Sequence, residues 1–413
     1  TIVYTSGTTG RPKGVMLTHR NILSNAAAAL ETFSVYPSDK FLSFLPMSHM
    51  LERMSGYYLP IMAGAAVAYA RSVPQLAEDL LSQQPTILVS VPRIYERVYT
   101  RINEQLAAGS PIKRKLFNLA TSVGWSRFEM QQGRGSWKPS MLLWPVLEKL
   151  VAGKIMAKLG GRLRTAIAGG AALSPEISKV FIGLGLPILQ GYGLTETSPL
   201  LTVNRIDANE PASVGQAAPG TELKVGEHNV LLARGPKVMM GYWNNPTATA
   251  AVLSSEGWFN TGDQARIGPH GHVYITGRVK DIIVMGNGEK VPPVDMELSI
   301  ISDSLFEQVL VLGEGKAYLA ALVSLNQEQW AKLSVSANFQ TDNPNTEAVH
   351  KMLLERIGTR MNSFPGYARI RRVCATLTPW TVENGFLTPT LKVKRAKVLE
   401  NFASDVESLF KKK

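Results

Sequence analysis

Hydroxyl, glycine and cationic side chains are concentrated in one stretch near the start of the chain. Three glycines, four hydroxyls and two cations occur in the run Thr5, Ser6, Gly7, Thr8, Thr9, Gly10, Arg11, Pro12, Lys13 and Gly14. Glycines let backbone N–H groups approach an anion, hydroxyls bond phosphate oxygens, and Lys13 adds a positive charge. The stretch predicts a phosphate-binding loop that is not a Walker loop. A solvated hairpin is the alternative interpretation.

A second cluster of side chains that could bind a nucleotide lies in the middle of the chain. It contains Gly191, Tyr192, Gly193, Thr195 and Glu196. An aromatic ring offers a stacking surface to a flat base, and a carboxylate oxygen is a ligand that Mg²⁺ accepts. The Thr195 hydroxyl can bond a phosphate oxygen. The cluster favours nucleotide binding, although a Gly-Tyr-Gly turn on its own also fits a structural role.

Two further turns follow expected strands. Residues 164–176 predict a strand, a turn at Gly169, Gly170 and Ala171, and a helix with Ser174 as its cap and Pro175 at its first position. Residues 257–263 end in Asp263 after a glycine, where a carboxylate can accept hydrogen bonds from two hydroxyls. For Asp263 the alternative is an ordinary surface turn.

The last candidates are cations in the C-terminal third of the chain. Arg278 and Lys280 lie in the short run 277–281, and Lys392 and Lys394 lie in the basic run 385–395. Counting back from Arg395 selects Lys392 as the functional lysine, with Lys394 as its competitor. A solvated charge run is the other interpretation of this segment.

Taken in order, these motifs resemble the signatures of the adenylate-forming (AMP-binding) superfamily, and the resemblance covers essentially the whole chain. Residues 51–58 and the form Thr388-Pro389-Thr390-Leu391-Lys392 look like the long-chain fatty-acid–CoA ligase branch, although many relatives have Ser-Gly before the lysine. The resemblance implies that ATP activates a long-chain fatty acid to an acyl-adenylate. Transfer to CoA then gives acyl-CoA, AMP and pyrophosphate.

The resemblance also implies residue roles in the nucleotide site. The first loop would hold the ATP phosphates, the Gly169 to Ala171 turn would contact adenine together with Tyr192, and Asp263 and Arg278 would bind the ribose. Thr195 would bond the α-phosphate, Glu196 would bind Mg²⁺, and Lys392 would bridge the carboxylate and the α-phosphate. These roles make Lys392, Thr195 and Glu196 the catalytic candidates.

Other roles implied by the resemblance concern the acyl chain and a change of conformation. His49 would line the acyl pocket, although a lone histidine beside apolar residues is more often structural. Lys280 would be the pivot of a hinge, and the segment with Gly286 and Gly288 would swing in for the CoA step. ATP, the fatty acid and CoA would therefore be substrates, and Mg²⁺ would accompany ATP.

The expected elements alternate between strands and helices. Residues 2–4 and 41–45 predict buried strands, residues 19–33 a helix, and residues 85–93 a strand followed by a helix. Such alternation favours an α/β fold with a largely parallel sheet. Residues 282–293 predict a hairpin around Asn287-Gly288, followed by a helix near residues 295–302.

The resemblance divides the chain into two domains. A large, multi-subdomain α/β nucleotide-binding domain is expected over residues 1–277, and a smaller, mobile α+β domain over residues 282–413, with a hinge at 278–281. Because the phosphate loop of the family normally follows a sizeable region, we expect the large domain to be N-terminally incomplete.

The composition is that of a globular protein. The 413 residues are 45% apolar and 18% charged, and Cys374 is the single cysteine, which excludes an internal disulfide and fits a reducing compartment. The longest apolar run, about residues 57–70, is too short for a bilayer span and contains Pro60 and Gly64. We expect a cytoplasmic protein without a transmembrane helix.

Positive charge is concentrated in residues 111–164. The chain carries a net charge of +12, and eleven of its Lys and Arg residues lie in this segment against Glu129 and Glu148. Trp125, Trp137 and Trp144 lie there too, which suits peripheral contact with a membrane interface. A solvated cationic surface with its tryptophans in the core is equally compatible. No nucleic-acid-binding module accompanies the charge, so nucleic acid is not expected as a partner.

Three other functions fit the same residues. A fatty-acyl-AMP ligase would stop at the adenylate and would not consume CoA. A fragment of the enzyme would bind nucleotide or lipid without turnover. A basic membrane-surface protein would bind liposomes in a salt-dependent manner.

Overall fold

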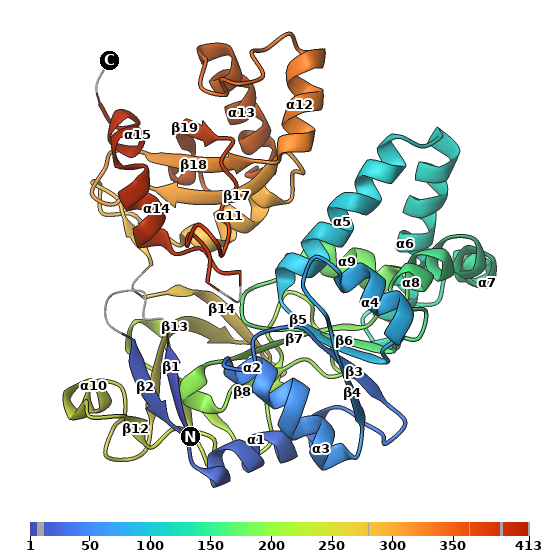
Figure 1. The fold of residues 1–413 in the computed structure, drawn as a ribbon, viewed down its shortest axis with the longest axis vertical. Coiled ribbons are helices and arrows are strands. Elements are labelled where there is room, and N and C mark those ends of the chain that lie inside the picture. The colour runs from blue at the N-terminus through green and yellow to red at the C-terminus, as the bar shows by residue number, and fades with distance from the viewer. Residues whose placement is uncertain (6–11, 280, 363, 389–390, 412–413) are drawn as a thin grey trace. The chain divides into compact units, whose positions relative to one another are not determined.

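The computed structural model describes residues 1–5, 12–279, 281–362, 364–388 and 391–411. The chain forms two compact units (Figure 1). The first comprises Thr1–Thr261 and Ala265–Ile275, and the second comprises Gly262–Gln264 and Thr276–Lys413. The predicted domain limits near residues 277 and 282 stay a prediction, because Lys280 lies outside the described residues.

The first unit is organised by a seven-stranded sheet with the order β4-β3-β5-β6-β7-β8-β9. Strands β4, β3, β5, β6 and β7 run parallel to one another. Strand β8 then pairs antiparallel with β7, and β9 pairs antiparallel with β8. The strands are β3 (Lys40–Ser43), β4 (Ala66–Tyr69), β5 (Ile87–Ser90), β6 (Thr165–Ala168), β7 (Ile188–Gly193), β8 (Leu200–Val203) and β9 (Gln216–Ala217). The predicted α/β class is confirmed.

Helices connect these strands, as right-handed crossovers between parallel strands require. They are α1 (His19–Thr32), α2 (Met50–Arg53), η1 (Met54–Tyr58), α3 (Leu59–Ala63), α4 (Leu76–Gln83), α5 (Pro92–Ala107), α6 (Pro111–Gln131), η2 (Pro139–Leu143), α7 (Trp144–Leu147), η3 (Glu148–Ala152), α8 (Gly153–Lys158) and α9 (Pro175–Gly183). Thr18 caps α1 in a capping box with Asn21, and Pro175 occupies the first turn of α9. The predicted helices at 19–33, after 90 and after 174 are confirmed.

Two smaller sheets complete the first unit. One has the order β1-β2-β12 and the other β10-β11-β13-β14. Their strands are β1 (Ile2–Thr5), β2 (Lys13–Met16), β10 (Glu222–Val225), β11 (Val230–Arg234), β12 (Gly241–Tyr242), β13 (Phe259–Ile267) and β14 (Val273–Arg278), with η4 (Thr195–Thr197), η5 (Glu227–Asn229) and α10 (Pro246–Ala250) between them. Strands β13 and β14 contribute residues to both units.

The prediction that residues 2–4 form a buried strand is wrong in one respect. The strand exists as β1, but only Val3 is buried, whereas Ile2 is 42% exposed and Tyr4 is 65% exposed. Strand β1 lies at the edge of its sheet and packs one face against the core, so its side chains alternate between interior and solvent.

The second unit contains a three-stranded sheet with the order β17-β18-β19, covered by helices. Its elements are β15 (Ile283–Val284), β16 (Lys290–Val291), α11 (Pro293–Ile301), β17 (Phe306–Leu312), β18 (Leu319–Leu325), α12 (Gln327–Ser336), α13 (Glu347–Arg360), η6 (Gly366–Ala368), β19 (Ile370–Thr376), α14 (Arg395–Asn401) and α15 (Ala403–Ser408). Every residue of β18 is buried, as expected for a central strand. The predicted hairpin is confirmed as β15 and β16, which pair antiparallel.

The three tryptophans of the basic segment have different environments. Trp144 is 6% exposed and packs in the core with Phe117 and Leu147, whereas Trp137 is 57% exposed. Trp125 is half-buried beside Phe128. The interpretation that tryptophans form a membrane-facing set is therefore wrong for Trp144. No helix within the described part of the chain has the length and apolarity needed to span a membrane.

Candidate active site

The turns after β6 and β7 meet at the carboxyl edge of the parallel sheet. The two strands are adjacent, with Ala168 opposite Gln190. A methyl group added to Gly169 would lie 3.8 Å from the carbonyl oxygen of Gly191, and Leu173 donates its backbone N–H to the Gln190 side chain over 3.0 Å. Two motifs that are distant in the sequence thus form one surface. Carboxyl ends of parallel strands are where α/β sheets bind ligands.

Glycine is required at one position of this surface. Gly170 has a φ of +82°, a backbone conformation in which an L side chain is strained. The bare turn formed by Gly169 and Gly170 leaves backbone accessible beside β7, where Tyr192 is half-buried. The arrangement suits the approach of a flat ring to the main chain.

Glu196 lies in the short helix η4, directly after this edge. Its Oε1 accepts a hydrogen bond of 2.8 Å from the hydroxyl of Tyr242. The ammonium group of Lys13 lies 4.8 Å from the centroid of the Tyr242 ring. Tyr242 therefore connects the strand that leaves the phosphate loop with the carboxylate of the second motif.

The pairing of β12 with β2 holds Tyr242 in this place. Tyr242 lies opposite Val15 in the sheet and is 6% exposed. Burial and the nearby charge of Glu196 both raise the pKa of Tyr242, so its hydroxyl stays protonated and donates to the carboxylate at neutral pH. Sequence analysis assigned Tyr242 no role. The aromatic run Gly241-Tyr242-Trp243 is the feature of the sequence that could have indicated Tyr242. The run alone does not show that this segment pairs with β2.

The residues around Glu196 fit a magnesium ion that arrives with a polyphosphate. Among the described residues, no cluster of three or more His, Cys, Asp or Glu side chains could hold a metal by itself. Mg²⁺ is commonly held by one or two carboxylates together with substrate phosphates. Glu196, with its second oxygen available beyond the Tyr242 bond, meets this requirement.

The predicted phosphate loop lies in the sequence between β1 and β2. Thr5 and Lys13 face each other at its two ends in the antiparallel ladder. Ser6, Gly7, Thr8, Thr9 and Gly10, which were predicted to bind phosphate, lie outside the described residues, as does the predicted pivot Lys280. Thr195 begins η4, next to Glu196.

The predicted ribose ligands are partners of each other. Arg278 donates from Nε to Oδ1 of Asp263 over 2.9 Å. The Asp263 side chain is 9% exposed and that of Arg278 is 36% exposed. Asp263 lies inside β13 and not in a surface turn, so the surface-turn alternative is wrong. Its burial beside a guanidinium makes the pair a fixed hydrogen-bonding site.

Lys392 belongs to the same compact unit as this pair. Its backbone closes a tight loop, because Thr388 donates to the carbonyl of Lys392 over 2.8 Å and Lys392 donates to the Thr388 hydroxyl over 3.0 Å. Lys392 is an exposed residue, although many protein atoms surround its ammonium group. This partial desolvation, and then the charge of Arg278, lower the pKa of Lys392, while Asp263 opposes the shift. The structure thus brings Lys392, Arg278 and Asp263 together.

Leu391, next to this lysine, adopts a left-handed backbone conformation with a φ of +62°. A branched side chain is strained there, and such strain concentrates at functional sites. Leu391 packs against the core that contains Phe386 and Leu387. The competing Lys394 donates its backbone N–H to Phe386 and precedes α14.

His49 has a structural role at the start of α2. Its Nδ1 accepts a hydrogen bond of 3.2 Å from the backbone N–H of Leu51, which makes His49 the cap of this helix. This position does not test the predicted role in an acyl pocket. The neighbouring Glu52, which sequence analysis did not single out, is 1% exposed and accepts a hydrogen bond from Ser43.

The Glu52 carboxyl group is buried and closely packed, and it accepts hydrogen bonds from the Ser43 hydroxyl and from the backbone of Phe44 and Leu45. Burial, partly offset by the hydrogen bond from Ser43, raises the pKa of Glu52 to about 7. A methyl group on Gly56 would lie 2.7 Å from Oε1 of Glu52, so only glycine fits in the π-helix η1 there. π-helical turns are frequent at functional sites.

Gly286 and Gly288, predicted for the CoA step, belong to the turn between β15 and β16. Gly286 donates to the carbonyl of Lys316 over 2.8 Å, and Gly288 has a φ of +86°. Both glycines are exposed. The turn is well defined, and its role in catalysis stays a prediction.

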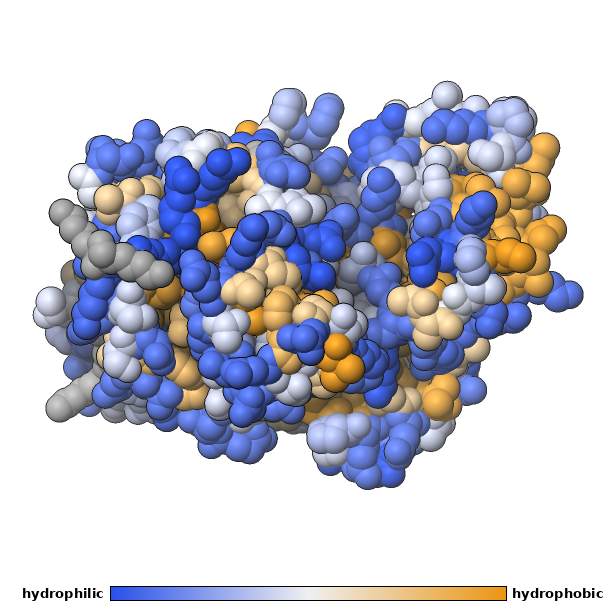
Figure 2. All heavy atoms as spheres, turned by 90° about the horizontal axis from the view of Figure 1, so that it is seen from above, coloured by the Kyte–Doolittle hydropathy of each residue, from blue (hydrophilic) through white to orange (hydrophobic). Residues whose placement is uncertain are grey.

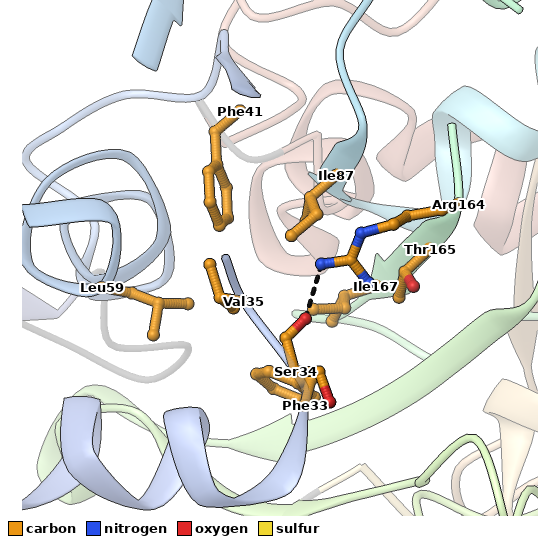
Figure 3. A pocket seen from close by; sticks show the side chains of 9 residues that line it. All are labelled: Phe33, Ser34, Val35, Phe41, Leu59, Ile87, Arg164, Thr165 and Ile167. Carbon is orange, nitrogen blue, oxygen red and sulfur yellow. Dashed lines mark hydrogen bonds between the residues drawn. The ribbon is translucent and has the colours of Figure 1, made fainter. Parts of the chain in front are cut away.

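A small pocket lies at the opposite edge of the parallel sheet, where β3, β5 and β6 begin (Figure 3). It is lined by Phe33, Ser34, Val35, Phe41, Leu59, Ile87, Arg164, Thr165 and Ile167. Arg164 crosses it, donating to the carbonyl oxygen of Ser34 and to Asp39. Its volume of about 10 Å³ is sufficient for about one water molecule. An acyl chain does not fit there.

Comparison with protein-family models identifies both parts of the chain. Residues 1–243 match the AMP-binding enzyme family, and residues 280–413 match the AMP-binding enzyme C-terminal domain. The chain belongs to the AMP-binding enzyme family, as its motifs predicted.

Curated relatives extend beyond this chain. Probable acyl-activating enzyme 16 of Arabidopsis thaliana is 34% identical over 100% of this chain and 63% of its own length. Long-chain-fatty-acid–CoA ligase FadD15 of Mycobacterium bovis is 34% identical over 100% of this chain and 69% of its own length. The chain therefore spans under two thirds of the first relative and slightly more of the second.

Solved structures of adenylate-forming enzymes share the fold. The adenylation domain of a carboxylate reductase from Mycobacterium chelonae has a TM-score of 0.73 at 22% identity, covering 99% of this chain and 59% of that one. ATP-bound MatB from Rhodopseudomonas palustris has a TM-score of 0.67 at 22% identity, covering 97% and 67%. At this identity the likeness concerns the fold alone.

Proposed function

We propose that this chain carries the adenylating and thioester-forming activity of a long-chain fatty-acid–CoA ligase. The observation that carries the proposal is the link from Lys13 through Tyr242 to Glu196, because it joins the phosphate loop to the second nucleotide motif. The name of FadD15, a relative that aligns along the whole chain, supports the substrate class.

In the first step, a fatty carboxylate oxygen attacks the α-phosphorus of ATP, the bond to the bridging oxygen breaks, and pyrophosphate leaves. Thr5, the loop residues 6–10, Lys13 and Thr195 bind the phosphates in this proposal. Glu196 and the phosphates would hold Mg²⁺, which would neutralise charge on the phosphates. Lys392 stabilises the negative charge that develops on the α-phosphate oxygens.

The nucleoside part is held by the remaining residues. The turn of Gly169, Gly170 and Ala171 and the run Gly191, Tyr192 and Gly193 contact adenine, and the Asp263–Arg278 pair binds the ribose. His49 lines the acyl pocket. In the second step, the thiol of CoA attacks the acyl carbon and AMP leaves, with Lys280 as pivot and the turn of Gly286 and Gly288 close to the thiol.

A different thiol acceptor is the second candidate. Long-chain-fatty-acid–[acyl-carrier-protein] ligase AEE15 of Arabidopsis thaliana is 33% identical over 99% of this chain. The carrier protein presents a phosphopantetheine thiol, as CoA does. Adenylation is the same in both cases, and only the acceptor of the acyl group differs.

Mass spectrometry of reaction products tests these proposals. The chain is incubated with Mg²⁺-ATP and a series of fatty acids, first alone, then with CoA, and then with phosphopantetheinylated carrier protein. Acyl-CoA supports the main proposal and reports the preferred chain length, whereas acyl-carrier protein alone supports the second. Acyl-adenylate as the only product, with no thioester in the reactions that contain CoA or carrier protein, indicates a ligase that stops at the adenylate. If no adenylate forms, the proposal is wrong for this chain.

A further inference from the structure

Four large apolar side chains lie exposed along one helical run of the first unit. The run continues through η2, α7 and η3, and Leu142, Leu143, Val146 and Leu150 on it are 71%, 47%, 58% and 46% exposed. We call these four residues the apolar strip. Figure 2 shows apolar residues gathered at the right-hand end of the molecule, over the elements α6 to α8.

The other side of the same helical run is also apolar. Met141, Trp144, Leu147 and Ala152 are buried, and the last three pack in a core with Phe117 and Leu184. A helix that packs on one side of a domain normally presents polar residues on the other side. Since this run is apolar on both sides, its packing within the unit does not explain the apolar strip.

Cations surround the apolar strip. Exposed lysines occur on the run itself and on both sides of it, at Lys138, Lys149, Lys154 and Lys158. Leu142, Val146, Leu150 and Lys154 follow one another at intervals of four residues along consecutive helical elements, and all four are exposed. Residues 111–164 contain two acidic residues, Glu129, which pairs with Arg134 over 2.9 Å, and Glu148, which is exposed on the run itself. Because the same residues include eleven Lys and Arg, the local charge is positive.

An apolar helical face bordered by lysines has the chemistry of an interfacial membrane helix. Apolar side chains enter the boundary between headgroups and acyl chains, and lysines remain at the level of anionic headgroups. We infer that the apolar strip docks on an anionic phospholipid membrane, with Lys138, Lys149 and Lys154 against the headgroups. This inference is independent of the proposed enzymatic activity.

A second copy of the chain is a less suitable occupant. In a two-fold symmetric dimer each patch meets its own copy, which would place the lysines at the border of one strip near those of the other. Like charges across an interface oppose association. An anionic lipid surface complements the same charges.

Vesicle co-sedimentation tests the inference. The chain is mixed, without ATP or fatty acid, with vesicles of phosphatidylcholine alone or with 30% phosphatidylglycerol, a composition of the order used to mimic anionic membranes. The test variant carries Leu142→Ser, Val146→Ser and Leu150→Ser. The matched control carries Val225→Ser, Val335→Ser and Val382→Ser, three exposed valines on other elements. Thermal unfolding verifies that both variants are folded.

We expect the unaltered chain and the control to bind anionic vesicles, and the test variant to lose at least about tenfold in apparent affinity. Binding should also weaken as salt rises, and a Lys138→Gln, Lys149→Gln and Lys154→Gln variant should show a smaller salt dependence. Equal binding by the test variant, or no binding by the unaltered chain, would overturn the inference. A dimer that dissociates only in the test variant would also overturn it and assign the strip to self-association.

Discussion

Two candidate functional regions, one in each compact unit, are built in opposite ways. The sheet edge of the first unit gathers residues from distant parts of the chain: Lys13 and Tyr242 lie on the paired strands β2 and β12, and Glu196 in η4 accepts a hydrogen bond from Tyr242. The loop around Lys392 is held by bonds between near neighbours, such as Thr388 and Lys392. Substitutions in the local loop should therefore change activity with little effect on stability, whereas substitutions at the edge should change both.

The largest effect is expected for Lys392→Ala. The change removes the positive charge proposed for the α-phosphate, and loss of one such charge partner costs on the order of a hundred- to a thousandfold in rate. Because Lys392 is exposed, the melting temperature should stay the same. Fatty-acid-dependent exchange between ATP and pyrophosphate measures the adenylation step.

Lys394→Ala is the matched control for this prediction. Lys394 is also exposed, and its hydrogen bond to Phe386 uses the backbone, which alanine retains. Its exchange rate should stay close to that of the unaltered chain. The opposite pattern, with Lys394→Ala inactive and Lys392→Ala active, would transfer the catalytic role to Lys394.

Glu52→Gln tests the cost of a buried carboxyl group near the sheet edge. Burial raises the pKa of Glu52 from 4.5 to about 7. Between pH 4.5 and pH 7, folding is therefore accompanied by the uptake of a proton by Glu52. Protonation of Glu52 thus contributes on the order of 3 kcal/mol to the free energy of unfolding. This contribution is complete below pH 4.5 and is lost as the pH rises to 7. Glutamine removes this pH dependence.

Urea unfolding of the first unit at pH values from 4.5 to 7.5 measures the effect. The control is Glu148→Gln, because Glu148 is an exposed glutamate of the same unit. The free energy of unfolding of the control should fall with pH as it does in the unaltered chain. A Glu52→Gln variant with the same pH profile as the unaltered chain would show that Glu52 does not titrate in this range.

Tyr242→Phe should have a moderate effect at the assembled edge. The ring remains over Lys13 and in the core, while the hydroxyl that orients Glu196 is lost. Removal of such an orienting partner typically lowers metal affinity by about ten- to a hundredfold. We expect the Mg²⁺ concentration for half-maximal adenylation to rise about tenfold. An unchanged Mg²⁺ dependence would separate Tyr242 from the metal site.

The smallest effect is expected at Leu391, in the local loop. Leu391→Gly removes side-chain packing but relieves the strain of a left-handed backbone, so the net loss of stability should be about 1 kcal/mol. Leu391→Ala loses the packing and keeps the strain, so it should be less stable than the glycine variant. Thermal unfolding compares the two. Equal stabilities would show that the strain at Leu391 is negligible.

Sequence patterns were most informative where one local signal sets the structure. The helix over residues 19–33, the helix start at Ser174 and Pro175, and the Asn287-Gly288 hairpin were predicted and are confirmed, although the Ser174 side chain makes no capping hydrogen bond to this helix. Each depends on neighbouring residues only. The order of motifs likewise identified the family.

Features that depend on tertiary pairing escaped prediction. The role of Tyr242 requires the knowledge that β12 pairs with β2, and the raised pKa of Glu52 requires the packing of η1 against Ser43. The exposure of Ile2 and Tyr4 follows from the position of β1 at a sheet edge. The strip at Leu142 was not located because the sequence of residues 111–164 does not show which of its leucines and tryptophans are exposed.

The pairing of β2 with β12 has a consequence for how the chain folds. Asn21 donates to the carbonyl oxygens of Pro236 and Val238, which are 215 and 217 residues further along the chain. During synthesis, the first hairpin and α1 must therefore wait for segments made much later, and contacts of such sequence separation form slowly. Until residue 242 has been made, β2 lacks its partner strand β12, so under the proposed function nucleotide is expected to bind only after the first unit is complete.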